Sequence, residues 1–105
     1  MTLTRSFKET VIARIGRDTD FRDALLREGV ECLLSGDVDT GKAVLRDYIN
    51  ATIGFEQLSE VTNTPTKSLM RMFSQKGNPQ ARNLFAVISH LQIQSGIHLE
   101  VRAVK

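Results

Sequence analysis

Apolar side chains recur every three or four residues through the first half of the chain, which places them on one face of a helix. This pattern predicts a short amphipathic helix or a mobile arm over residues 4–15, ended by Gly16. A second helix is expected to start near Asp20 and to end at Ser35 and Gly36. A third should cover residues 38–52, with Asp37 or Asp39 accepting from the free N–H groups of its first turn.

The second half of the chain breaks into shorter elements. Its pattern predicts helices at about residues 55–61, 65–74 and 80–94, with Gly96 after the last. Residues 97–104 then alternate apolar with polar side chains, which is strand periodicity. A single strand needs a partner, so we expect this one to pair across a homodimer axis. Its dimer-facing residues would be Leu99, Val101 and Ala103.

The fold class that follows is all-α, with five or six short helices and a C-terminal β-strand. The chain has 105 residues and is 41% apolar, which suffices for one modest core. We expect residues 1–18 to form an arm or short helix and residues 19–105 to form the helical domain. No apolar run approaches the length of a membrane span, and the N-terminus lacks the pattern of a secretory signal. Together with a single cysteine, Cys32, this predicts a cytoplasmic protein.

Charge is distributed unevenly along the chain. Residues 1–60 carry 8 basic and 11 acidic side chains, whereas residues 61–105 carry 6 basic and 1 acidic. No acidic residue occurs between Val61 and Leu99. Because carboxylates repel a phosphate backbone, this distribution indicates a nucleic-acid-facing half, with chance unevenness as the alternative. The basic residues of the acid-free segment are Lys67, Arg71, Lys76 and Arg82.

Residues 55–74 have the pattern of a helix-turn-helix, in which two short helices cross steeply through a turn of three or four residues. Leu58 would be the inner anchor of the first helix, and Ser59 the small residue at the crossing. Asn63 suits the turn because asparagine tolerates positive φ. Thr64 is expected to cap the second helix and Pro65 to occupy its first turn. The residues of the second helix expected to face inward are Leu69, Met72 and Phe73.

The outward residues of the second helix have the chemistry of a major-groove reader. Arg71 can address guanine bidentately, Met70 can contact a thymine methyl group, and Thr66 offers a hydroxyl and a methyl group. Lys67 could reach a base or a phosphate. The residues expected to hold phosphates are Gln57, Ser74, Lys76 and Asn78. The alternative is a buried apolar stripe with Lys67 and Arg71 as its solvated edge.

The span from Gly54 to Val101 resembles the lambda-repressor-like (Cro-type) helix-turn-helix. More closely, it resembles the small addiction-module antidote antitoxins, which are usually encoded beside a RelE/ParE-type toxin. The resemblance rests on "LSEVTNTPTKSLMRM", then "GNP", an apolar helix and a short hydrophobic tail. Ser59 stands where alanine is usual and Asn63 where glycine is usual, and residues 1–50 match the antidote pattern only loosely.

The resemblance implies a homodimeric repressor of its own promoter, with a RelE/ParE-type toxin as a candidate partner. Two recognition helices would then enter successive major grooves about 34 Å apart. The family's DNA-contacting positions fall on Gln57, Thr66, Lys67, Met70 and Arg71.

No catalytic or metal-binding pattern is present in the sequence. His90 and His98 lie eight residues apart without further ligands at metal spacing, and Gly41-Lys42 lacks the glycine run of a phosphate loop. We therefore expect no enzyme activity, no cofactor and no metal. Two function classes remain. The first is a sequence-specific regulator of double-stranded DNA, autorepressing and a candidate antitoxin; the second is a protein-interaction module whose main role is to sequester a toxin.

Overall fold

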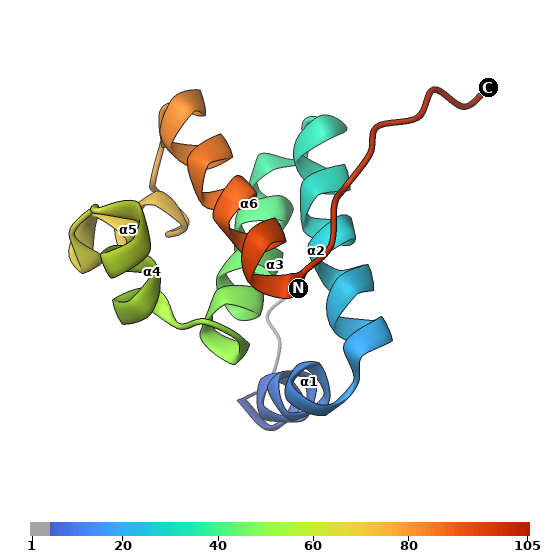
Figure 1. The fold of residues 1–105 in the computed structure, drawn as a ribbon, viewed down its shortest axis with the longest axis horizontal. Coiled ribbons are helices and arrows are strands. Elements are labelled where there is room, and N and C mark those ends of the chain that lie inside the picture. The colour runs from blue at the N-terminus through green and yellow to red at the C-terminus, as the bar shows by residue number, and fades with distance from the viewer. Residues whose placement is uncertain (1–4) are drawn as a thin grey trace.

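The computed structural model describes residues 5–105, and this part of the chain folds into six helices around one core (Figure 1). The all-α fold is confirmed. None of the six helices is both long and apolar enough to cross a membrane. Their bounds are α1 Arg5–Arg17, α2 Thr19–Leu34, α3 Val38–Ala51, α4 Phe55–Thr62, α5 Thr66–Met72 and α6 Ala81–Ser95.

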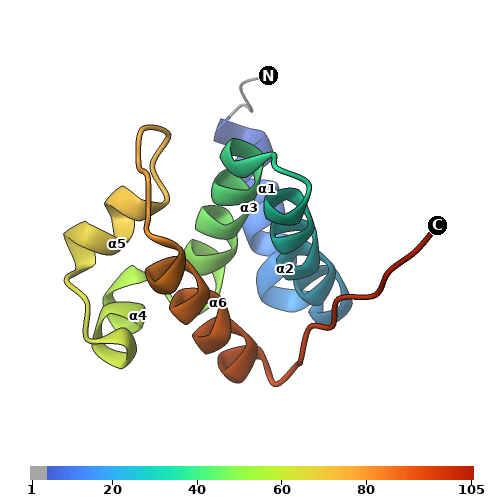
Figure 2. The same ribbon diagram turned by 90° about the horizontal axis from the view of Figure 1, so that it is seen from above.

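Helices α2 and α3 lie side by side, and two glycines let them approach closely (Figure 2). A Cβ atom at Gly29 would lie 2.9 Å from Cδ2 of Leu45. A Cβ atom at Gly41 would lie 2.7 Å from Cδ2 of Leu33 and 3.0 Å from the carbonyl oxygen of Gly29. An alanine at either position would therefore have to push a leucine side chain aside, and at Gly41 it would also press on the backbone of α2.

Aspartate side chains cap the N-termini of α2 and α3, and glycines in the left-handed conformation follow the C-termini of α2 and α6. Asp37, one of the two residues expected to cap α3, accepts from the backbone N–H of Thr40. The cap of α2 is Asp18 and not Asp20, because Asp18 is the last extended residue and its Oδ1 accepts from the N–H of Phe21 at 3.1 Å. Gly36 and Gly96 adopt positive φ directly after α2 and α6, as the sequence predicted.

Helix α1 packs against α2 and α3 and is part of the same globule (Figure 1). Its Ile15 is fully buried, and the Arg14 guanidinium lies 4.2 Å from the centre of the Phe21 ring. Of the two forms expected for the N-terminal segment, the helix is the one that occurs. The side chains of Phe7, Val11 and Ile12, which complete its expected apolar face, lie outside what the structure describes.

The β-strand expected over residues 97–104 is not formed. Residues 97–105 have no regular secondary structure, and no described segment pairs with them. Leu99 packs on the chain's own core, and its N–H donates to Oε1 of Gln92 at 2.8 Å. Beyond it Val101 and Ala103 are exposed, and the tail runs away from the globule (Figure 1). The alternating pattern needs a second strand to become a ladder, and this single chain does not supply one.

Candidate nucleic-acid interface

The connection between α4 and α5 is a short turn with one left-handed residue. Asn63 has φ 53° and ψ 39°, and it is the one non-glycine residue with positive φ in the described chain. The N–H of Thr64 donates to the carbonyl of Ser59, and the Ser59 hydroxyl donates to the carbonyl of Thr64. The left-handed conformation predicted for Asn63 is confirmed, and Ser59 also closes the turn through its hydroxyl.

The start of α5 differs from the prediction. The Thr64 hydroxyl donates to the carbonyl of Thr62 and makes no cap to α5. Pro65 holds the N-cap position, with its carbonyl accepting from the N–H of Leu69 at 3.0 Å. The physical reason is the backbone of Pro65, which is still extended at ψ 141°, so the helix begins only at Thr66. Thr64 therefore lies one position too early to reach the first free N–H groups of α5.

The inner face of α5 is buried as predicted. Leu69, Met72 and Phe73 belong to the main core together with Leu58 of α4. The Phe73 ring lies 6.2 Å from the ring of Phe55 with an interplanar angle of 56°, an arrangement typical of aromatic pairs in protein cores. This packing anchors α5 firmly, whichever of the two interpretations of its outer face is correct.

The outer face of α5 is cationic with an apolar centre. Lys67 and Arg71 are exposed, Met70 between them is 53% exposed, and Thr66 is half-buried. Neither cation of this face pairs with a carboxylate in the described part of the chain, and the same holds for Lys76 and Arg82 nearby. The helix lies at one end of the molecule, away from α1 and α2 (Figures 1 and 2). Four charges thus remain available to a polyanion.

A buried lysine fixes the loop that follows α5. Lys42 of α3 is 3% exposed, and its Nζ donates to the carbonyl oxygens of Ser74 at 2.9 Å and Gly77 at 2.7 Å. A longer contact joins it to the carbonyl of Gln75 at 3.4 Å, and Asp39 lies 3.9 Å away. These contacts of Lys42 with residues 74–77, the loop clamp, were not predicted from the sequence. The sequence does contain a sign of this contact, because Lys42 lies one helical turn from Leu45 and therefore on the inner face of α3.

The residues expected at phosphates occupy different environments. Lys76 and Asn78 are exposed on the clamped loop. Ser74 is half-buried, and its hydroxyl donates to the carbonyl of Arg71 at 2.7 Å, so it serves to end α5. Gln57 is exposed on α4 but lines a hollow together with Glu56 and Glu60. Two carboxylates beside Gln57 oppose a phosphate there, whereas the segment that contains α5 and its loop has no acidic residue of its own.

The described residues include no group of three histidine, cysteine or acidic side chains placed to hold a metal ion. Cys32 is half-buried, and burial followed by the charge of Glu28 raises the pKa of its thiol, which lowers its reactivity as a nucleophile. No protein-family model, curated protein or solved structure matches the chain when its sequence and fold are compared with them.

Proposed function

We propose that this protein binds double-stranded DNA with α5 in the major groove and acts as a transcriptional regulator. The observation that carries the proposal is the unpaired cationic face of α5, held by a buried inner face and lying within a segment without acidic residues. Helices α4 and α5 would then form a lambda-repressor-like helix-turn-helix, for which the left-handed Asn63 and the buried Leu58 are favourable.

In this proposal Arg71 pairs with guanine through its guanidinium fork, while Met70 contacts a thymine methyl group. Thr66 and Lys67 complete the base-reading face at the start of α5. Lys76 and Asn78 bind phosphates from the clamped loop, since both are exposed beside α5. Further backbone contacts come from Arg82 at the first turn of α6, which is exposed and unpaired.

The proposed regulator is a homodimer that represses its own promoter. Val101 and Ala103 are exposed and unpaired, so tails of two copies can pair from residue 101 onward, beyond the core-packed Leu99. The molecule measures 38 Å along its longest axis, with α5 near one end and the tail at the other (Figure 1). Two copies joined by their tails would place the α5 helices further apart than one DNA turn. Half-sites two turns apart, about 68 Å, are then expected.

A labelled duplex of the upstream region, titrated by fluorescence anisotropy at two salt concentrations, tests the DNA proposal. Arg71→Ala should weaken binding by about ten- to hundredfold, because each bidentate base contact contributes about 1–3 kcal/mol. The matched control is Arg27→Ala, which removes an exposed arginine of α2 that pairs with Glu31. Equal affinity of both variants, or binding that salt does not weaken, would contradict the assignment of α5 as the reading helix.

A second candidate function is the sequestration of a basic protein, such as a RelE/ParE-type toxin. The favouring observation is an acidic corner at the α2–α3 turn, where Leu34 and Val38 are 60% and 44% exposed. Residues 28–39, which include this turn, carry 4 acidic side chains and no basic one, which complements a basic partner. Leu34→Ser with Val38→Ser should then abolish capture of a basic protein encoded beside this gene and preserve DNA binding. Arg71→Ala should do the reverse.

A further inference from the structure

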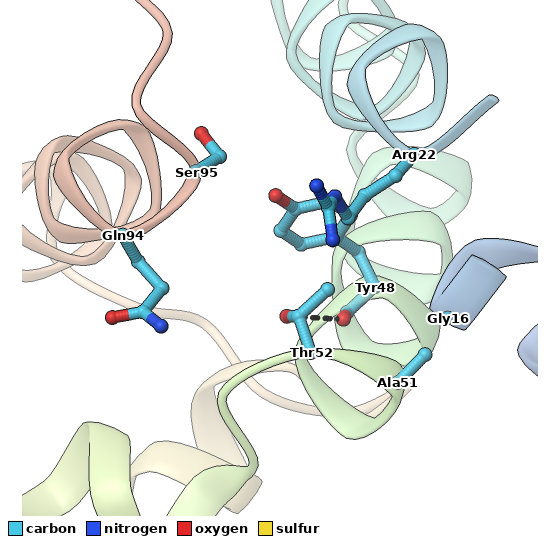
Figure 3. A pocket seen from close by; sticks show the side chains of 7 residues that line it. All are labelled: Gly16, Arg22, Tyr48, Ala51, Thr52, Gln94 and Ser95. Carbon is cyan, nitrogen blue, oxygen red and sulfur yellow. Dashed lines mark hydrogen bonds between the residues drawn. The ribbon is translucent and has the colours of Figure 1, made fainter. Parts of the chain in front are cut away.

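A cavity of about 220 Å³ opens where the ends of α1, α3 and α6 meet the start of α2 (Figure 3). Its walls carry polar groups from three helices that are distant in sequence. Arg22 comes from α2, Tyr48 and Thr52 from the end of α3, and Gln94 and Ser95 from the end of α6. The cavity does not include any residue of the α5 face, so whatever it binds is independent of the DNA proposal.

Arg22 is the one charged residue in the wall of this cavity. The side chain is largely buried, and its Nε has no hydrogen-bond partner among the described residues. No described carboxylate lies within ion-pair distance of its guanidinium. Asp23 is the next residue, but it does not line the cavity and its own buried Oδ1 is also unpartnered. A buried guanidinium nitrogen is normally hydrogen-bonded, so an anion in the cavity would supply a partner that this Nε lacks.

The other wall groups complete a donor site. Thr52 and Ser95 have committed their hydroxyl hydrogens, to the carbonyl of Tyr48 at 2.7 Å and to that of Gln92 at 3.1 Å. The Tyr48 hydroxyl interacts with the Ser95 side chain, and the donors that remain are the guanidinium of Arg22 and the exposed amide of Gln94. Burial raises the pKa of the Tyr48 phenol, while the hydrogen bond with Ser95 and then the positive charge of Arg22 lower it and the charge of Asp23 raises it. The wall therefore offers one positive charge, that of Arg22, beside uncharged polar groups.

We propose that this cavity binds a small molecule through an oxyanion, a carboxylate or a phosphate, held by the Arg22 guanidinium with Gln94 as a second donor. The planar guanidinium matches either group with two parallel hydrogen bonds. The volume is below the roughly 300 Å³ at which drug-sized ligand sites begin, so the occupant is the size of a small metabolite. Such a ligand would join α2 to the ends of α3 and α6 and stabilise the folded chain.

Tyr48 provides a direct readout, because it is the single tyrosine of a chain without tryptophan. Sodium acetate and sodium phosphate are titrated separately at constant ionic strength, with chloride as the reference anion, while tyrosine fluorescence and the thermal midpoint Tm are recorded. We expect one anion or both to give a saturable fluorescence change and a raised Tm. A response to acetate alone identifies a carboxylate site, and a response to phosphate alone identifies a phosphate site.

Arg22→Gln should weaken the response about ten- to hundredfold, which is the range for hydrogen bonds to a charged group. Arg27→Gln, an exposed position five residues further along α2, should leave it unchanged. Gln94→Ala provides a second variant on the protein surface, where a folding defect is not expected, and should weaken binding several-fold. The absence of a saturable response to both anions, or an undiminished response in Arg22→Gln, would overturn the proposal.

Discussion

The ammonium group of Lys42 lies 2.7 Å from the carbonyl oxygen of Gly77, and this contact joins α3 to the loop after α5. The same ammonium group bonds the carbonyl of Ser74, so one buried cation satisfies the main chain on both sides of a turn. The loop carries Lys76 and Asn78, which are exposed and are proposed to bind DNA phosphates. The positions of these residues relative to α5 therefore depend on a residue that lies outside the DNA-facing segment.

Replacing Lys42 with methionine keeps the aliphatic stem and removes the three donors. We expect the free energy of unfolding to fall by about 1–3 kcal/mol, because partly buried carbonyls lose their partner. DNA affinity should fall as well, since the loop loses its attachment. Urea unfolding and anisotropy measure the two effects. Asp39→Asn is the control, because the exposed Asp39 carboxylate contributes at most about 1 kcal/mol. Unchanged stability of Lys42→Met would contradict the role of the loop clamp.

Gly77 is expected to tolerate no side chain. A Cβ atom there would overlap the carbonyl oxygen of Arg71 and lie 3.0 Å from that of Met72. Because both are backbone atoms, Gly77→Ala should force the loop away from α5 and lower the free energy of unfolding by about 1–3 kcal/mol or more. Gly16→Ala is the matched substitution, since a Cβ at Gly16 meets nothing within 4 Å and lies inside α1. It should be neutral or stabilising by up to about 1 kcal/mol in the same urea titration.

Asn63 should be sensitive to the shape of its replacement, although its side chain is exposed. A β-branched side chain is strained at φ 53°, so Asn63→Val should cost about 1–2 kcal/mol of unfolding free energy. Asn63→Gly should remain within about 0.5 kcal/mol of the parent, because glycine adopts this conformation readily. Chemical denaturation of the three proteins separates the two cases. Equal losses for valine and glycine would assign the effect to the asparagine side chain and not to the backbone.

Tyr48 should give the protein a component of stability that is lost at alkaline pH. Burial raises the pKa of its phenol above the usual value of 10.0, so the fold favours the neutral form. This stabilisation is fully present below pH 10 and disappears as the pH rises through the higher folded pKa. Unfolding free energies measured between about pH 8 and about pH 12 should therefore fall less steeply for Tyr48→Phe. Parallel pH profiles of the two proteins would contradict the raised pKa.

Much of the fold follows from local patterns in the sequence. The helical periodicity located all six helices within a few residues, and glycines 36 and 96 marked two of their ends. The left-handed Asn63 and the buried Leu58, Leu69 and Phe73 were also predicted, since each depends on neighbours within one or two turns. Features that depend on residues within one or two helical turns follow from backbone geometry and from the apolar face of a single helix. Both can be read from the order of residue types in the sequence.

The errors have equally definite causes. Asp18 and Pro65, and not Asp20 and Thr64, hold the cap positions, because the exact first residue of a helix depends on extended geometry just before it. The tail residues 97–105 alternate like a strand but lack a second strand in the described chain. Alternation of apolar and polar residues shows that a segment can form a strand. It does not show that a second strand is present to pair with it.

The sequence by itself determined the helices, the turn at Asn63 and the acid-free cationic face of α5, because these depend on residue types at short spacing. The tertiary structure alone decided the contacts between segments distant along the chain. It brought Lys42 to the loop 32 to 35 residues further on, and it enclosed Arg22 in a wall with Tyr48 and Ser95. Such contacts arise when separate apolar faces pack together, and the partner that a polar group then meets is fixed by that packing.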